Sequence, residues 1–290
     1  MPVPTGKGIS GIKFGNGPPK FGGGGGGATP NTGGPSGPPS RFTNSRPGTK
    51  GPDGFNTGTQ KEEKPLGMTK ETLPKVLEAF ETYLAEGGDE GPMGPYTFLT
   101  AGGAFRVLND LSVTTTDIDI WSITDADTQT ANDAGKIFSS SPTGKSYNLN
   151  FDFFNGALSS GMAYYDGSKL FKAYAQNPAI LPMWQSSKKW LTLYALPIEW
   201  QIQTKMVRMS NWYTAGLVHD EKYVKDMQHV LSLMWKMSDG GKDKVDILGV
   251  QGWLSGYQVP GNKFNYAGGL LQAIKAEFGK YVQNGGKYIP

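Results

Sequence analysis

The sequence of 290 residues contains no cysteine, which excludes a disulfide framework, a cysteine metal site and a cysteine nucleophile. Histidine is scarce as well, because only His219 and His229 occur and no acidic residue pairs with them at metal-ligand spacing. We therefore expect no zinc site and no histidine-based catalytic triad. We expect His229 to lie on a helix surface or in an interface.

Long apolar runs are also missing. No stretch approaches the ~18 consecutive apolar residues that a membrane-spanning helix needs. The N-terminus lacks the charged-then-apolar pattern that is typical of a secretion signal. These absences predict a cytoplasmic protein without a membrane partner.

Acidic residues are absent from the first 52 residues, a stretch rich in glycine and proline. The cations of this stretch are Lys7, Lys13, Lys20, Arg41, Arg46 and Lys50, which give it a charge of +6. Because the whole chain has a net charge of +3, the residues after position 52 carry about −3. Too little apolar surface is available here to offset chain entropy, so we expect residues 1–66 to form a disordered basic arm. Six charges over about fifty residues are sparse, which favours a solvated linker. The alternative is nucleic-acid binding, in which Phe14, Phe21 and Phe42 would stack on bases.

The rest of the chain begins as an alternation of helix-like and strand-like segments. Helices are expected over 69–88, 104–110 and 128–140, and strands over 96–103, 114–123 and 147–154. Beyond residue 168 the pattern becomes helical, over 168–176, 195–213, 220–237 and 267–283. The fold class predicted from this order is α/β (α+β), with a small mixed sheet in residues 67–165 and a helical region over 166–290.

Two aspartates interrupt the expected strand at 114–123. Asp117 and Asp119 are two residues apart, so in a strand they share one face, while Ile118 and Ile120 share the other. Two like charges on one buried face are costly, and a divalent cation between them would remove that cost. Mg²⁺ prefers such carboxylate oxygens together with phosphates. A half-exposed strand with both acids in water explains the pattern equally well.

Two neighbouring features favour the metal interpretation. Gly102 and Gly103 end the preceding strand where a helix is expected, and glycine there lets the backbone approach a phosphate. Asp152 provides a further acid in the strand expected at 147–154. Three strand acids beside a glycine turn suit two divalent metals and a nucleoside triphosphate.

The segment "TAGGAFRVLNDLSVTTTDIDIW" followed by "NFDFF" resembles the nucleotidyltransferase fold of the polymerase-β-like superfamily. Within it, the chain is most similar to AbiEii-toxin-like and minimal nucleotidyltransferases, over roughly residues 70–236. Thr115 matches the threonine of their Thr-x-Asp-x-Asp pattern, and Lys205 with Arg208 matches their lysine–arginine helix. Lys225 and Asp226 match their Lys-Asp pair.

Three positions depart from the family pattern. Val113 stands where an arginine is usual, Ala104 where a serine follows the glycine, and His229 where a second aspartate is common.

The resemblance implies metal-dependent nucleotidyl transfer from a nucleoside triphosphate to a hydroxyl of an RNA end, a small molecule or a protein. Asp117, Asp119 and Asp152 would be catalytic and hold Mg²⁺ or Mn²⁺, whereas Gly102, Gly103, Thr115, Lys205 and Arg208 would bind the nucleotide. Because a fold does not fix a function, a second hypothesis is a non-catalytic scaffold that binds nucleic acid or assembles with copies of itself, as a coat protein does.

Overall fold

The computed structural model describes residues 67–87 and 93–289. These belong to one compact unit that spans residues 61–290. The basic arm expected over 1–66 lies outside the described residues. The boundary expected at residue 165 does not separate two units, because two strands beyond it join the same sheet as the strands before it.

The described chain folds into α-helices, short 3₁₀ helices and a sheet. The α-helices are α1 (Leu73–Glu86), α2 (Gly103–Leu108), α3 (Asp125–Ser140), α4 (Pro142–Ser146), α5 (Ser159–Met162), α6 (Gly167–Tyr174), α7 (Ile198–Thr214), α8 (Glu221–Met237) and α9 (Leu270–Gln283). The 3₁₀ helices η1 (Ile247–Gly252) and η2 (Ser255–Tyr257) lie between α8 and α9. The strands are β1 (Tyr96–Ala101), β2 (Ile118–Trp121), β3 (Phe154–Asn155), β4 (Trp184–Gln185) and β5 (Leu191–Ala195).

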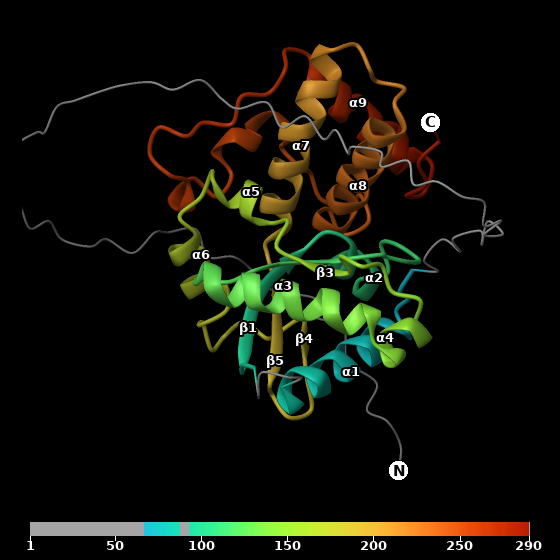
Figure 1. Ribbon diagram of the computed structural model, residues 1–290. Coiled ribbons are helices and arrows are strands. Elements are labelled where there is room, and N and C mark those ends of the chain that lie inside the picture. Colours follow the sequence, from blue (N-terminus) through green and yellow to red (C-terminus); the bar gives the residue numbers. More distant parts are fainter. Residues whose placement is uncertain (1–66, 88–92, 290) are drawn as a thin grey trace, which may run out of the picture. The chain divides into compact units, whose positions relative to one another are not determined.

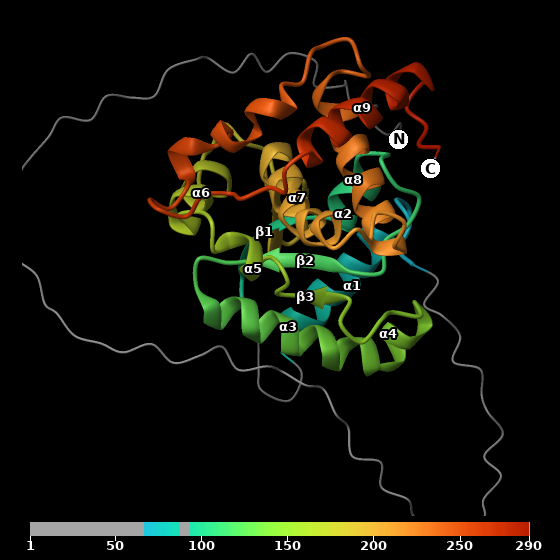
Figure 2. The same cartoon turned by 90° about the horizontal axis from the view of Figure 1, so that it is seen from above.

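The five strands form one mixed sheet in the order β3-β2-β1-β5-β4. Strand β1 is antiparallel to β2 and parallel to β5, and β3 runs parallel to β2. The predicted α/β class with a mixed sheet is therefore confirmed. Helices α1 and α3 lie on one side of the sheet, and α7 and α8 lie on the other (Figures 1 and 2).

The side-chain alternation of β1 explains this layering. Phe98 packs in a core with apolar residues of α1 and α3, whereas Leu99 and Ala101 pack in a second core with α7, α8 and α9. In β2, Ile118 and Ile120 are fully buried in the first core. Successive strand residues point to opposite faces, so Asp119 faces the α7 side of the sheet.

Two expectations about strands are wrong. The strand expected at 147–154 is reduced to Phe154–Asn155, because α4 and a turn at 151–152 precede it. Strands β4 and β5 were not expected, yet β5 pairs with β1 through five consecutive residue pairs. Leu191, Thr192 and Leu193 are all buried, so this strand lacks the alternating polarity by which a half-exposed strand is recognised.

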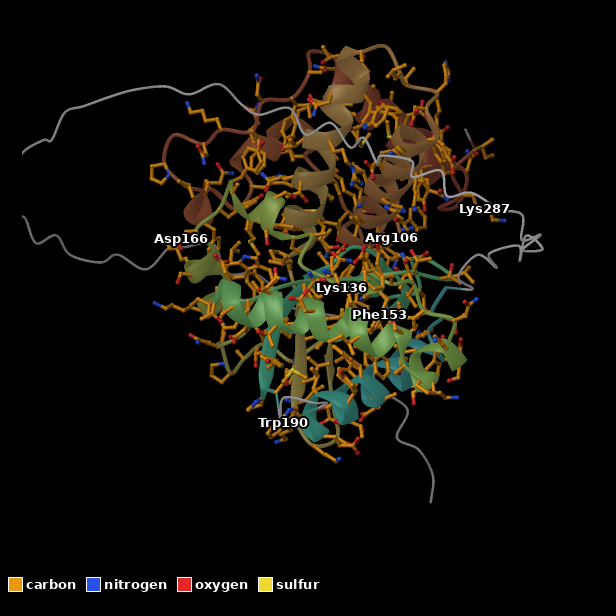
Figure 3. All side chains as sticks on the ribbon, in the orientation of Figure 1. Arg106, Lys136, Phe153, Asp166, Trp190 and Lys287 are labelled. Carbon is orange, nitrogen blue, oxygen red and sulfur yellow. The ribbon has the colours of Figure 1, made fainter. Side chains whose placement is uncertain are left out.

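The turn between β4 and β5 is fixed to the segment before β1. Trp190, in this turn, lies at the end of the sheet away from α7 and α8 (Figure 3). Arg106 lies at the other end, between the sheet and these two helices. The Trp190 Nε1–H donates to the carbonyl of Met93 at 2.6 Å.

Across residues 67–87 and 93–289, no helix has the length and apolar character needed to cross a membrane.

Candidate functional site

The Gly102–Gly103 turn lies directly against the residues that carry the acidic motif. Gly102 ends β1 with φ of 71°, and a Cβ on it would lie 2.8 Å from Asp119 Oδ2. A Cβ on Gly103 would lie only 1.9 Å from Thr115 Oγ1. The Gly102 N–H donates to Gln201 Oε1 at 3.1 Å, which joins the turn to α7. Both positions therefore need glycine because the backbone approaches these side chains so closely.

Asp119 lies between two neighbouring strands. It is opposite Ala101 of β1 and opposite Asn155 of β3. The Asn155 amide donates to the backbone carbonyl of Asp152 at 3.0 Å and accepts from the Ala157 N–H at 2.9 Å. The Thr100 hydroxyl donates to the Asp119 backbone carbonyl at 2.8 Å. These contacts fix the backbone of Asp119 in the sheet, on the strand face that looks toward α7.

Asp117 precedes β2 and is held by Thr115. The Thr115 hydroxyl donates to the backbone carbonyl of Asp117 at 2.9 Å and contacts its Oδ1 at 3.2 Å. Thr115 is itself buried and bonded through its backbone to Met68. The structure thus brings Thr115 together with the acids as a residue that orients Asp117.

Burial strongly affects the ionisation of Asp119. Its pKa is raised to about 6, first by burial and then by the negative charge of Asp117. Lys205 and the hydrogen bond from Asn155 act in the opposite direction without cancelling the effect. In the absence of a cation, the two neighbouring carboxylates are therefore an unfavourable pair.

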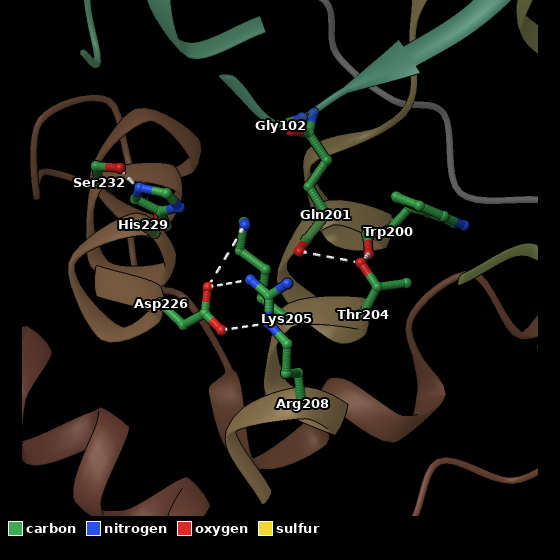
Figure 4. Close-up of polar contacts among 9 residues, drawn as sticks. All are labelled: Gly102, Trp200, Gln201, Thr204, Lys205, Arg208, Asp226, His229 and Ser232. Carbon is green, nitrogen blue, oxygen red and sulfur yellow. Dashed lines mark hydrogen bonds and ion pairs between the residues drawn. The ribbon is translucent and has the colours of Figure 1, made fainter. Parts of the chain in front are cut away.

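The two cations expected on α7 share one carboxylate partner on α8 (Figure 4). Arg208 binds Asp226 in a bidentate manner, with its Nε 2.6 Å from Asp226 Oδ2. The Lys205 ammonium lies 3.7 Å from Asp226 Oδ1. Asp226 is almost fully buried, whereas Arg208 remains largely exposed. Asp226 therefore holds both cations in place and leaves the guanidinium accessible from solvent.

Lys205 is the more buried of the two cations. Its pKa is lowered to about 8, first by burial and also by the charges of Arg208 and Arg106, while Asp226 and Asp119 oppose this shift. The ammonium form still predominates at pH 7. A buried ammonium with one carboxylate at 3.7 Å is well placed to accept a second anionic partner.

A cavity of about 380 Å³ lies between Asp119 and α7, and Asp117, Thr115 and Gly103 are not among its lining residues. Gly102 and Asp119 line it from the sheet, and Gln201, Lys205 and Arg208 line it from α7. The remaining lining residues are Ala101, Ala157, Leu158, Ser160, Gly161, Tyr164, Trp200, Thr204, Val207 and Asn211. Its size is in the range of small-molecule sites, and it combines charged groups with aromatic side chains.

Asp152 does not join this group, and the expectation of a third strand acid is wrong. Asp152 lies in the exposed turn before β3, and the residue opposite Asp119 is Asn155. No cluster of three or more histidine, aspartate or glutamate side chains suited to a metal ion occurs in the part of the chain that the structure describes. The carboxylates that remain are the pair Asp117 and Asp119.

His229 lies on α8 and is half-buried. Burial lowers its pKa, and the nearby charges of Lys205 and Arg106 lower it further. Among the described residues, its Nδ1 has no hydrogen-bond partner. The Ser232 hydroxyl donates to its backbone carbonyl at 2.9 Å (Figure 4). His229 is therefore a neutral neighbour of the cations.

Sequence reasoning missed Gln201 and Asn155. Gln201 precedes Lys205 by four residues on α7, and that spacing places both on one helix face, so helical periodicity would have found it. The position of Asn155 depends on strand register, which the sequence did not reveal.

No family model, curated protein or solved structure matches this chain.

Proposed function

We propose that this cavity binds a nucleoside triphosphate together with a divalent cation, and that the protein transfers the nucleotidyl group to an acceptor hydroxyl. The observation that carries the proposal is the meeting of Asp119 with the Gly102 turn and Lys205 in one cavity. Acidic and basic groups on opposite walls match a ligand that is a metal complex of a polyanion. The motif resemblance described above gives the reaction type.

The donor set fits a hard divalent cation. Asp117 and Asp119 supply carboxylate oxygens, and the pKa of Asp119 is raised first by its burial and then by the charge of Asp117. Mg²⁺ or Mn²⁺ bound there would compensate the two carboxylates and the phosphate charge. Thr115 keeps the Asp117 carboxylate in place through its hydroxyl.

The other residues have separable roles toward the triphosphate. Gly102 lines the cavity beside Asp119, so a phosphate bound there would lie against the backbone of the turn, while Gly103 leaves room for Thr115. Lys205 would donate to a phosphate oxygen and stabilise the charge that develops on departing pyrophosphate. Arg208 would add a second, more exposed cation, while Asp226 fixes its orientation.

Asn155 favours a second candidate function. It occupies the strand position opposite Asp119, and a neutral amide there cannot replace a third metal-binding carboxylate. A scaffold that binds the metal–nucleotide complex, or uses the fold for nucleic-acid binding or self-assembly, would need no third acid. This candidate predicts binding without transfer.

A transfer assay distinguishes the two candidates. The full chain is incubated with Mg²⁺, an α-labelled nucleoside triphosphate and RNA, a small-molecule alcohol or protein as acceptor. Nucleotidyl transfer predicts Mg²⁺-dependent pyrophosphate release with label on the acceptor, both abolished by Asp119→Asn and unaffected by the control Asp243→Asn, a substitution on the exposed surface. Binding without any release would favour the scaffold, and Asn155→Asp would then test whether only the third acid is missing.

A further inference from the structure

Three aromatic rings from distant parts of the sequence form a stack at the cavity. Tyr164, between α5 and α6, stacks on Phe264 with ring centroids 4.8 Å apart and planes at 21°. Phe264 stacks in turn on Tyr266, with centroids 5.9 Å apart and planes at 5°. Phe264 and Tyr266 are buried, whereas Tyr164 is half-buried and lines the cavity. Tyr164 is therefore the end of the stack that a ligand can reach.

The backbone around this stack is held by hydrogen bonds. The Val259 N–H donates to the Tyr164 carbonyl at 3.1 Å, and the Asn262 amide donates to the Ala163 carbonyl at 2.9 Å. The Ala267 N–H donates to the Ser210 hydroxyl of α7, which joins the far end of the stack to the cavity wall. A ring supported in this way loses little freedom when a second ring packs on it.

The segment that carries the stack contacts α7 two residues beyond Arg208, whereas the Gly102 turn contacts α7 near its start. Gln201 contacts the Gly102 turn, whereas Ser210, which contacts the stack segment, is nine residues further along the helix, ~13 Å away at 1.5 Å per residue. Asn211, the next residue, also lines the cavity and offers an amide donor and acceptor. The cavity thus combines an anion-binding wall, made by the Gly102 turn, Lys205 and Arg208, with an aromatic ring and an amide.

We propose that Tyr164 is the platform on which the nucleotide's base stacks, and that the cavity selects a nucleoside triphosphate over a polyphosphate without a base. This inference rests on the proposed function. Phosphates would lie at Gly102 and Lys205, and the base would pack on the Tyr164 ring with Asn211 beside its polar edge. Stacking is tolerant of base identity because every base has a flat π-face.

The test compares ATP with inorganic tripolyphosphate, each with Mg²⁺, by calorimetric titration of the full chain. Tripolyphosphate has the three linked phosphates of the nucleotide but lacks its ribose and base. Tyr164→Ala should weaken ATP binding about tenfold and leave tripolyphosphate binding unchanged. Tyr164→Phe should bind ATP as the wild type does. Tyr164→Leu, which keeps apolar volume without a ring, should behave as the alanine variant.

Each outcome decides a different claim. If the wild type binds ATP and tripolyphosphate equally, and Tyr164→Ala changes neither, the base platform is refuted while the phosphate and metal site stands. If the wild type binds neither ligand, the proposed function fails, and this inference fails with it. Tripolyphosphate binding by each variant also reports whether its cavity is still folded. Tyr147→Leu, a ring change in the other core, should bind both ligands as the wild type does.

Discussion

Replacement of Asp119 by asparagine should stabilise the protein in the absence of metal. Asp119 ionises with a pKa of about 6 in the folded state, against 3.8 for the unperturbed side chain. At 1.36 kcal/mol per pKa unit, this shift corresponds to a destabilisation of at most about 3 kcal/mol when the group is ionised. This shift already includes the opposing attraction of Lys205, so we expect a net stabilisation of about 1 to 3 kcal/mol at pH 7.

The pH dependence provides a second check on the same change. Between pH 4 and 6 the folded state binds more protons at Asp119 than the unfolded state does, so wild-type stability falls as pH rises through this window. The difference between Asp119→Asn and wild type should therefore be small near pH 4 and reach its full value above pH 6.

Urea unfolding in EDTA, measured from pH 4 to 8, gives both quantities. Asp243→Asn, a substitution on the exposed surface, is the matched control and should show no such pH-dependent gain. The reasoning is refuted if Asp119→Asn is less stable than wild type at pH 7 by an amount that does not vary with pH. That result would make Asp119 a structural hydrogen-bonding residue.

Other parts of the site and chain give further predictions. Gly103→Ala should destabilise by about 1 to 3 kcal/mol, since its Cβ would lie 1.9 Å from Thr115 Oγ1. The control Gly279→Ala lies in α9, where a Cβ would have no atom within 4 Å, and it should instead stabilise by about 0.5 to 1 kcal/mol. Both effects can be measured by thermal unfolding, and equal shifts in the melting temperature of the two variants would contradict this prediction. Asp226→Asn, which removes the buried partner of the α7 cations, should cost about 2 kcal/mol and weaken Mg²⁺–nucleotide binding in calorimetry; intact binding would argue against a role for those cations. Deletion of residues 1–60 should leave the melting temperature nearly unchanged by calorimetry, because their composition supports no core; a large loss would identify the arm as a structural element.

The sequence was sufficient to predict the main helices and the strands that carry the acidic motif. In β2, alternation of aspartate with isoleucine correctly assigned the two isoleucines to the core, because strand periodicity is a local property. Helices α7 and α8 were recognisable because their apolar residues recur with helical spacing over many residues.

Features that depend on pairing between distant segments were not predictable. Asp152 looked like a strand acid because apolar residues flank it, but only the pairing of β2 with β3 shows that Asn155 is opposite Asp119. Strand β5 is buried on both faces and short, so its sequence has no alternating polarity. The contact between Tyr164 and Phe264 joins segments a hundred positions apart, and nothing near either residue indicates it.

The most direct test of the account is Mn²⁺ binding to the full chain, measured by electron paramagnetic resonance with and without ATP. Free Mn²⁺ gives a sharp signal that is lost on binding, so the measurement reports the metal at the carboxylate pair without requiring turnover. We expect the wild type to bind Mn²⁺ more tightly when ATP is present, and we expect Asp117→Asn combined with Asp119→Asn to abolish this ATP-dependent binding. Equal binding by wild type and the double variant would contradict the claim that Asp117 and Asp119 form a metal–nucleotide site.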